Sequence, residues 1–303
     1  MTQASAYVPS PIKRSRRRGR GDMDTIREAI YEVLEADNPM TVRQVFYQLV
    51  GRGAIEKTEA EYKQTIGRLL TEMRRAGEIP FDWIADNTRW MRKPRTYDSL
   101  RNMLELTKDT YRRALWNDQP AYVEVWLEKD ALAGVVYQET RHWDVPLMVT
   151  RGYPSVSYLH AAAETIGATG KPAHLYYFGD HDPSGRDITR ATEAGLREFA
   201  PEAEIYFERV AVTEEQITSL RLPTRPTKTT DSRSKSFAGE SVEVDAIPPE
   251  HLRLLVRSCI ECHIDEDRLR RTELVEAAER ETLARIVGNL PAQSRARRKT
   301  VRK

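Results

Sequence analysis

The chain has 303 residues, enough for one large or two ordinary domains with a substantial core. Its 48 lysines and arginines nearly balance its 46 aspartates and glutamates, which gives a formal net charge of only +2. No stretch approaches the roughly 18 consecutive apolar residues of a transmembrane helix, and the basic N-terminus lacks the apolar segment of a signal peptide. The composition therefore speaks against a membrane protein, and we expect a cytoplasmic one.

Positive charge is concentrated at the two ends of the chain. Residues 13–20 and residues 295–303 each hold six lysines or arginines, so the rest of the chain is acidic. Such segments are too polar to fold alone, and we expect residues 1–21 to form a disordered basic arm and residues 291–303 a basic tail. Nonspecific contact with nucleic-acid phosphates and simple solubilisation are equally good interpretations of these ends. The candidate phosphate contacts in the arm are Arg14, Arg16, Arg17 and Arg18.

Residues 22–87 show the pattern of a small helical domain. The predicted helices, from apolar spacing, are residues 24–36, 42–50 and 57–76. Thr41 is a good N-cap for the second of them, and residues 77–84 could supply a β element after the third. Three short helices followed by a β element are typical of a winged helix, a relative of the helix-turn-helix DNA-binding domains. A small helical docking domain is the alternative.

Residues 88–119 carry many charges between apolar positions and are predicted to be a helical linker. A basic cluster near its start lies close in sequence to Trp90 and Tyr97, a combination that suits contact with a nucleic-acid backbone and stacking on bases or sugars. The cluster consists of Arg89, Arg92, Lys93 and Arg95. A solvated loop is an equally good interpretation.

Strands and helices alternate from residue 120 onward. The predicted strands, which are rich in β-forming residues, are residues 121–128, 146–150, 175–178 and 204–210. Alternating strands and helices predict a parallel sheet built from βαβ units. In open sheets of this kind, ligands and catalytic groups gather at the carboxyl ends of the strands.

Acidic residues stand at the carboxyl ends of two predicted strands. Glu128 ends the first, and Asp180 and Asp182 follow the apolar run that ends at Phe178. Carboxylates this close repel each other unless a cation lies between them, and a divalent cation such as Mg²⁺ is the usual one. An isolated Asp-x-Asp is more often a strand-to-helix turn with an acidic N-cap. The second acidic strand end favours the metal site.

The only two cysteines belong to the sequence Cys259-Ile-Glu-Cys262-His263, which is formally the attachment pattern of c-type haem. The motif falls within a predicted helix over residues 249–265, in a chain without an export signal, which argues against haem. A zinc site would need two further ligands from scattered histidines. We therefore expect packed or surface cysteines in a reducing compartment.

Three motifs, taken in order, resemble a Toprim domain of the kind found in the topoisomerase VI A subunit and its relative, the meiotic double-strand-break protein. The motifs are Leu127-Glu128-Lys129-Asp130-Ala131, Gly152-Tyr153-Pro154 and Asp180-His181-Asp182-Pro183-Ser184-Gly185. The similarity spans residues 120–290 and includes the segment from Val242 to Ile247. It implies a Rossmann-like, mostly parallel sheet in which Glu128, Asp180 and Asp182 hold Mg²⁺, with Mn²⁺ as a substitute.

A short phrase in the N-terminal domain resembles a second motif of the same family. Thr41-Val42-Arg43 is followed by Phe46-Tyr47, as the family's Ser/Thr-Val-Arg precedes its catalytic tyrosine. Matched position by position, Tyr47 falls on the nucleophile and Arg43 on its companion arginine. The same helix also has an apolar stripe, so a Tyr47 that merely packs in the core is the alternative.

The resemblance as a whole implies an α/β protein with a winged-helix domain followed by a Toprim domain. It implies Mg²⁺-dependent cleavage of double-stranded DNA by a nucleoid-associated homodimer, in which Tyr47 forms a 5′-phosphotyrosyl link. An ATPase B-type subunit is a possible partner. Two alternatives keep the fold: a Toprim nuclease that uses a metal-activated water, and a noncatalytic DNA-binding protein. No phosphate-cradling glycine loop is visible, so ATP use within this chain is not expected.

Overall fold

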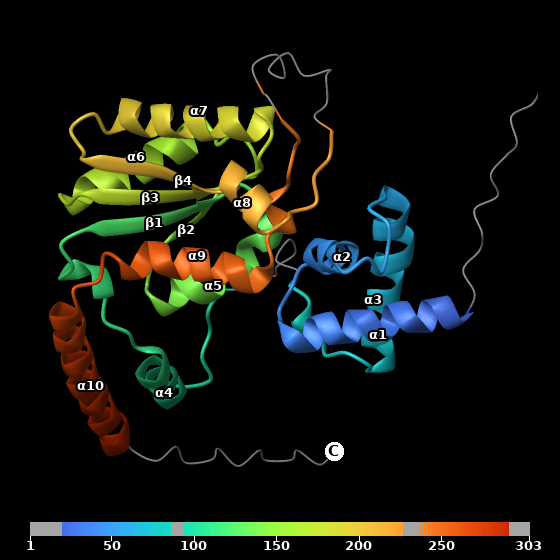
Figure 1. The fold of residues 1–303 in the computed structure, drawn as a ribbon. Coiled ribbons are helices and arrows are strands. Elements are labelled where there is room, and N and C mark those ends of the chain that lie inside the picture. Colours follow the sequence, from blue (N-terminus) through green and yellow to red (C-terminus); the bar gives the residue numbers. More distant parts are fainter. Residues whose placement is uncertain (1–19, 86–93, 227–236, 238, 291–303) are drawn as a thin grey trace, which may run out of the picture.

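The structure, a computed structural model, describes residues 20–85, 94–226, 237 and 239–290 (Figure 1). Its N-terminal elements are α1 (Arg20–Ala36), α2 (Val42–Gly51), the π-helical segment Glu61–Ile66, α3 (Gly67–Ala76) and the 3₁₀ turn Phe81–Trp83. All three predicted helices are present. The first begins four residues earlier than predicted, at Arg20, and Asp22 in its first turn suits the positive end of the helix dipole. Residues 1–19 of the predicted arm lie outside the described residues.

Helix α2 has the N-terminus that its sequence predicts. The Thr41 hydroxyl accepts a hydrogen bond from the Gln44 amide at 3.1 Å, and the Gln44 side chain accepts one from the Thr41 amide at 3.0 Å. This reciprocal capping box satisfies two backbone donors that the first helical turn would otherwise leave unpaired. The cap therefore fixes where α2 starts.

The β element predicted after α3 is reduced to one bridge. Helix α3 ends at Ala76 and is capped by Gly77, whose φ of +74° suits glycine. The only β contact described in residues 77–85 is a parallel bridge between Met40 and Ile84. Pro80 has no backbone N–H to donate to a neighbouring strand, and the 3₁₀ turn that follows it interrupts the extended backbone. No β-hairpin is formed in this described stretch.

The predicted parallel sheet is confirmed. Its strands are β1 (Tyr122–Leu127), β2 (Leu147–Val149), β3 (Ala173–Phe178) and β4 (Ile205–Ala211), in the order β2-β1-β3-β4, and every pairing is parallel. In the register, Leu127 lies opposite Val149 on one side and Phe178 on the other. The carboxyl ends of β1, β2 and β3 therefore meet at one edge of the sheet.

Helices cover both faces of the sheet (Figure 1). The helices are α5 (Ala133–His142) and α9 (Pro249–Glu261) on one face, and α6 (Val156–Thr169) and α7 (Pro183–Phe199) on the other. Successive side chains of β1 point to opposite faces of the sheet. Val125 and Leu127 pack against the first pair of helices, and Trp126 packs against the second. The α/β part is thus a three-layer structure.

The N-terminal helices pack directly against the α5/α9 layer. One continuous cluster of buried apolar side chains runs from Ile30 and Leu49 in the helices to Ile247 and Leu252 beside the sheet. The Arg253 guanidinium also reaches across, forming an ion pair with Asp37 and donating a hydrogen bond to a backbone carbonyl of the same loop. This packing presents α2 to the loops at the carboxyl edge of the sheet.

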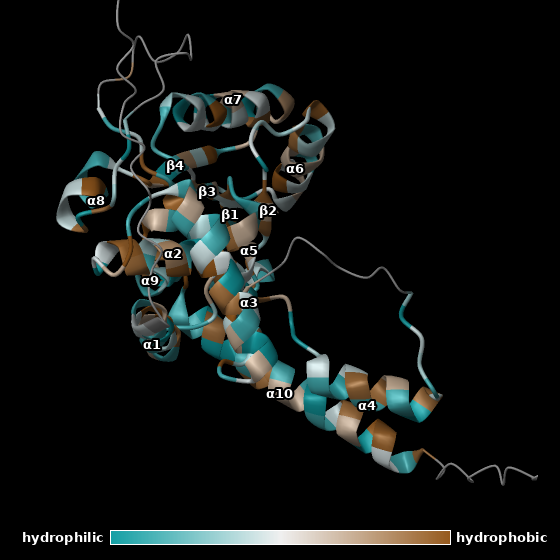
Figure 2. Cartoon of the chain, turned by 90° about the vertical axis from the view of Figure 1, so that its right-hand side faces the viewer, coloured by the Kyte–Doolittle hydropathy of each residue, from teal (hydrophilic) through white to brown (hydrophobic). Residues whose placement is uncertain are grey.

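Two further helices form a pair that extends away from the sheet (Figure 2). They are α4 (Leu100–Thr110), which lies within the predicted helical linker, and α10 (Glu266–Asn289). The Arg101 side chain joins them by a 3.1 Å hydrogen bond to the Val287 carbonyl. The remaining helix, α8 (Glu214–Ser219), follows β4. Among the helices that the structure describes, none is long and apolar enough to cross a membrane.

A buried carboxylate in the second layer makes the stability of the fold depend on pH. Glu124, on β1, is 1% exposed and accepts 2.8 Å hydrogen bonds from the Tyr122 hydroxyl and the Trp126 indole. Burial outweighs these bonds and raises its pKa to about 7. The folded state therefore binds this proton more tightly than the unfolded state, and the associated stability is complete below about pH 4.5 and is lost as the pH rises through 7.

We expect Glu124→Gln to flatten this pH dependence. In the parent chain, the Glu124 proton contributes stability on the order of 3 kcal/mol at pH 4.5, most of which disappears by pH 8. Urea unfolding at several pH values, with the exposed Glu198→Gln as the control, measures the effect. An equally steep profile in both variants would show that Glu124 does not titrate in this range.

Candidate active site

The predicted acidic residues meet where β1 and β3 end. Glu128 is the first residue after β1, and Asp180 follows β3 by two residues. The Asp180 amide donates a 3.0 Å hydrogen bond to Glu128 Oε2, so two acids 52 positions apart in the chain lie side by side. They meet because β1 and β3 are neighbours in a parallel sheet.

Two glycines permit this close approach. A Cβ at Gly179 would lie 2.5 Å from Glu128 Oε2, and a Cβ at Gly185 would lie 2.2 Å from the Asp180 carbonyl oxygen. Both separations are too short for nonbonded atoms, so any side chain at these positions would displace an acid or the start of α7. The acidic turn therefore requires glycine at both positions.

Arg209, on β4, supports the same turn from inside the protein. Its guanidinium donates hydrogen bonds to the backbone carbonyls of Gly179, Asp180 and Gly185 and to the Thr189 hydroxyl. A guanidinium can make this many directed bonds because it carries five donors in one plane. Arg209 thus joins the end of β3 to the first turn of α7, a role for which the sequence analysis had not selected it.

Asp182 has a helix-capping role. Its Oδ1 accepts a 2.8 Å hydrogen bond from the Gly185 amide as the N-cap of α7, and Pro183 takes the first helical position. Its Oδ2 lies 3.8 Å from a guanidinium nitrogen of Arg225. The acidic N-cap, which was the alternative interpretation of the Asp-x-Asp motif, is therefore present at Asp182.

Glu128 and Asp180 hold their protons more tightly than usual. Burial, and after it the charge of Asp180, raises the pKa of Glu128 to about 7, and Asp182 adds to the effect. Burial also raises the pKa of Asp180, although the nearby Lys129 opposes the rise. A divalent cation at this edge would relieve the repulsion among the three carboxylates.

The chemistry of these acids fits a hard cation, since they offer only carboxylate oxygens. However, no group of three or more His, Cys, Asp or Glu side chains within the described ranges is already arranged to hold a metal ion. Asp180 and Asp182 each turn Oδ1 toward a backbone amide. A site for Mg²⁺ or Mn²⁺ on Glu128, Asp180 and Asp182 therefore stays a prediction.

Lys129 lies at the centre of a second group of acids. Its ammonium nitrogen is 2.6 Å from Asp245 Oδ2, 2.9 Å from Glu243 Oε2 and 3.2 Å from Asp180 Oδ1. These charges outweigh burial and raise the pKa of Lys129 well above its usual value, so the side chain is a fixed cation. Asp245 is fully buried, and its Oδ1 has no hydrogen-bond partner among the described residues.

Helix α2 joins this group through Arg43. The Arg43 guanidinium forms an ion pair with Glu243 and lies 5.0 Å from the centre of the Tyr62 ring. Burial opposes ionisation of Glu243, but Lys129 and Arg43 outweigh it and lower the pKa of that carboxyl group to about 2. The two parts of the chain are therefore linked by a permanent ionic contact at the candidate site.

Tyr47 lies on α2 one turn after Arg43 and is 6% exposed. Its ring packs 5.4 Å from that of Phe46 and 5.4 Å from the ammonium of Lys57, while its hydroxyl makes no hydrogen bond to the described part of the chain. Burial, followed by the charge of Glu243, raises the pKa of Tyr47 to about 12. The phenol is thus neutral at pH 7 and adjacent to the ionic group.

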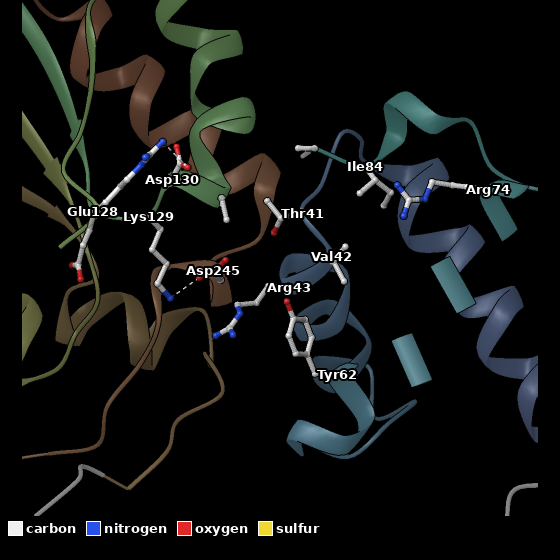
Figure 3. Close-up of a pocket in the computed structure, with 13 residues that line it drawn as sticks. Thr41, Val42, Arg43, Tyr62, Arg74, Ile84, Glu128, Lys129, Asp130 and Asp245 are labelled. Carbon is white, nitrogen blue, oxygen red and sulfur yellow. Dashed lines mark hydrogen bonds and ion pairs between the residues drawn. The ribbon is translucent and has the colours of Figure 1, made fainter. Parts of the chain in front are cut away.

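A cleft of about 590 Å³ opens between α2 and the edge of the sheet (Figure 3). Lys129 and Arg43 point into the same space from opposite sides of it. The described residues that line the cleft are Thr41, Val42, Arg43, Tyr62, Arg74, Ile84, Ala85, Glu128, Lys129, Asp130, Ala131, Arg151 and Asp245. Four of these side chains are cationic and three are acidic, so the cleft could take an anionic ligand together with a cation beside the acids.

The other predicted sites receive less support. Arg14, Arg16, Arg17, Arg18, Arg89, Arg92 and Lys93 lie outside the described residues. Arg95 is exposed. Of the two cysteines, Cys259 is half-buried and Cys262 is exposed, as expected of packed or surface cysteines. The neighbouring His263 pairs its Nε2 with the Tyr176 hydroxyl at 2.6 Å.

Two comparisons with known proteins were made. Neither a scan against models of protein families nor a search of curated proteins finds a match. The geometry of the site therefore carries the functional argument.

Proposed function

We infer that this protein cleaves DNA strands in the manner of topoisomerase VI A-like proteins, with Tyr47 as the nucleophile. One observation carries the inference: the helix that bears Arg43 and Tyr47 meets the acidic strand ends through a continuous ionic chain. That chain runs from Arg43 through Glu243 and Lys129 to Asp180. Such a meeting is needed if a phenol is to attack a phosphate held by the acids.

The fold is consistent with this proposal. N-terminal helices with a capped second helix precede a four-stranded parallel sheet with interleaved helices. In our proposal the helices act as a winged-helix DNA-binding domain, even though the wing is reduced to one bridge, and the sheet acts as a Toprim domain. A homodimer on double-stranded DNA, in the cytoplasm and associated with the nucleoid, belongs to the same proposal.

In the proposed step, the Tyr47 oxygen forms a bond to a backbone phosphorus as the bond from phosphorus to the 3′ oxygen breaks. The phenol releases its proton to solvent, the 3′ oxygen takes one up, and a 5′-phosphotyrosyl link remains. A phenol with a pKa near 12 is a weak nucleophile at neutral pH. Deprotonation of Tyr47 is therefore the part of the reaction for which the resting site is least prepared.

Two fixed cations favour the attack. Arg43 can donate two parallel hydrogen bonds to phosphate oxygens, and Lys129 adds a point charge beside it. Both also lower the proton affinity of Tyr47, in opposition to burial. Glu128, Asp180 and Asp182 would hold Mg²⁺, which when bound neutralises phosphate charge.

Trapping a covalent adduct tests the proposal. Incubation with supercoiled DNA and Mg²⁺ or Mn²⁺, followed by denaturation, should leave protein attached to 5′ ends, and chelation of the metal should abolish the adduct. Nicking without an adduct would favour the nuclease that uses a metal-activated water. Binding without any cleavage, in the presence of every plausible partner, would leave only the DNA-binding interpretation.

A further inference from the structure

Glu243 is enclosed by cations from three separate segments. Its Oε2 contacts Arg43 of α2 and lies 2.9 Å from the Lys129 ammonium, while its Oε1 lies 2.8 Å from a guanidinium nitrogen of Arg225. The side chain is only 8% exposed. One carboxylate thus occupies a small site in which both oxygens are contacted by positive charge.

The cations around Glu243 differ in the ion pairs that they form with other acids. Lys129 also contacts Asp245 and Asp180, so it stays neutralised whatever happens to Glu243. Arg43 has its described ion pair with Glu243 alone, and Arg225 has Asp182 as a second partner at the longer distance of 3.8 Å. Loss of Glu243 would therefore leave Arg43 without its described ion pair and Arg225 with only the longer contact to Asp182.

These cations can be reached from solvent although the carboxylate is covered. Arg43 and Arg225 are 35% and 38% exposed, and Arg43 and Lys129 line the cleft. Two more cationic side chains, Arg74 and Arg151, line the same cleft. An anion in the cleft would therefore share that space with cationic side chains of both parts of the protein.

The site also lies next to the proposed nucleophile. Arg43, whose guanidinium forms the ion pair with Glu243, precedes Tyr47 by one turn of α2. An anion that replaced Glu243 would therefore be held by a side chain of the same helix.

The backbone at Glu243 is anchored on both sides. The Val242 carbonyl accepts a 2.8 Å hydrogen bond from the His181 amide, and the Val244 amide donates a 2.8 Å hydrogen bond to Asp180 Oδ1. Because the backbone is held on both sides, displacement of the carboxylate would have to come from rotation of the Glu243 side chain.

We propose that Arg43, Lys129 and Arg225 form a binding site for one DNA phosphate, and that Glu243 fills it when DNA is absent. Guanidinium pairs on a two-oxygen anion suit a phosphodiester as well as a carboxylate. Glu243 then acts as an internal competitor that keeps the site closed until DNA displaces it. The inference rests on the proposed function for its ligand, DNA, but it does not depend on cleavage.

Binding measurements on Glu243→Gln test this site. In the Tyr47→Phe background, where no adduct can form, we expect Glu243→Gln to bind a short DNA duplex about tenfold more tightly than its parent. Its plot of log affinity against log salt should keep the slope of the parent, because the same phosphate is neutralised in both proteins once DNA has displaced Glu243. The exposed Glu240→Gln, which removes the same charge three residues away, is the matched control.

Equal affinities for Glu243→Gln and Glu240→Gln would overturn the proposal and leave Glu243 as a structural ion pair. If Glu243→Gln does not fold, Arg225→Gln decides instead, because it should weaken DNA binding and flatten the salt slope more than the exposed Arg221→Gln does. The outcomes separate the two proposals. Tighter binding by Glu243→Gln, with no adduct in the wild type, would support the phosphate site and contradict the cleavage reaction. An adduct in the wild type, with unchanged binding by Glu243→Gln, would support cleavage and contradict the phosphate site.

Discussion

Tyr47→Phe is expected to form no covalent adduct with DNA while folding normally. The substitution keeps the ring that packs against Phe46 and removes only the attacking oxygen. Because that hydroxyl makes no hydrogen bond within the described residues, its loss should change the free energy of unfolding by less than about 1 kcal/mol. Urea unfolding and denaturing gels of DNA treated with protein measure the two effects.

The exposed Tyr31→Phe, in the same N-terminal helical part, is the matched control and should keep the adduct. Adduct formation by the wild type should also accelerate about tenfold per pH unit between pH 7 and 9, because the phenolate of a group with a pKa near 12 increases by that factor. An adduct that persists in Tyr47→Phe would show that another residue is the nucleophile.

The sheet and its acidic edge were predictable because their signals are local. Apolar runs of strand length, separated by helices, led to four parallel strands, and the structure places each where the pattern predicts it. The adjacency of Glu128 and Asp180 follows once the strands are parallel, since the carboxyl ends of neighbours meet. The capped start of α2 was equally visible in Thr41 and the residues after it.

The ionic group was not predictable, because it depends on contacts between distant segments. Glu243 lies 200 positions from Arg43 and 114 from Lys129, and no local pattern sets such a pairing. Lys129 and Glu243 both fall within segments that carry the family resemblance, but no role was predicted for either. Arg209 was missed for a related reason: a single arginine within a strand does not reveal that it will meet three backbone carbonyls.

The resting site is stabilised in a form that differs from what the reaction needs. Glu243 is paired with the cations, Tyr47 holds its proton, and the pKa of Glu128 is raised, which favours the protonated carboxyl group. Binding of DNA would displace the Glu243 carboxylate, and binding of a divalent cation would ionise Glu128. A site of this kind would react only when both ligands are present.

Asp180→Asn is expected to lose Mg²⁺-dependent cleavage by a factor of about 100 or more, because metal-assisted neutralisation of phosphate is worth several kcal/mol. The amide keeps an oxygen for the Val244 backbone N–H and so preserves the turn. It removes the ion pair with Lys129 but also the repulsion that Asp180 exerts on Glu128. Stability should therefore change little, and the pKa of Glu128 should fall toward its usual value.

Mn²⁺ titration, cleavage rates and unfolding of Asp180→Asn provide the measurements, with Asp267→Asn on α10, 78% exposed, as the control for an equivalent change far from the site. Wild-type Mn²⁺ affinity and cleavage in Asp180→Asn would show that the acidic edge holds no catalytic metal. Comparison with Tyr47→Phe then decides the mechanism. Loss of cleavage in both variants supports the phosphotyrosyl link, whereas cleavage that survives in Tyr47→Phe but disappears in Asp180→Asn supports attack by a metal-activated water.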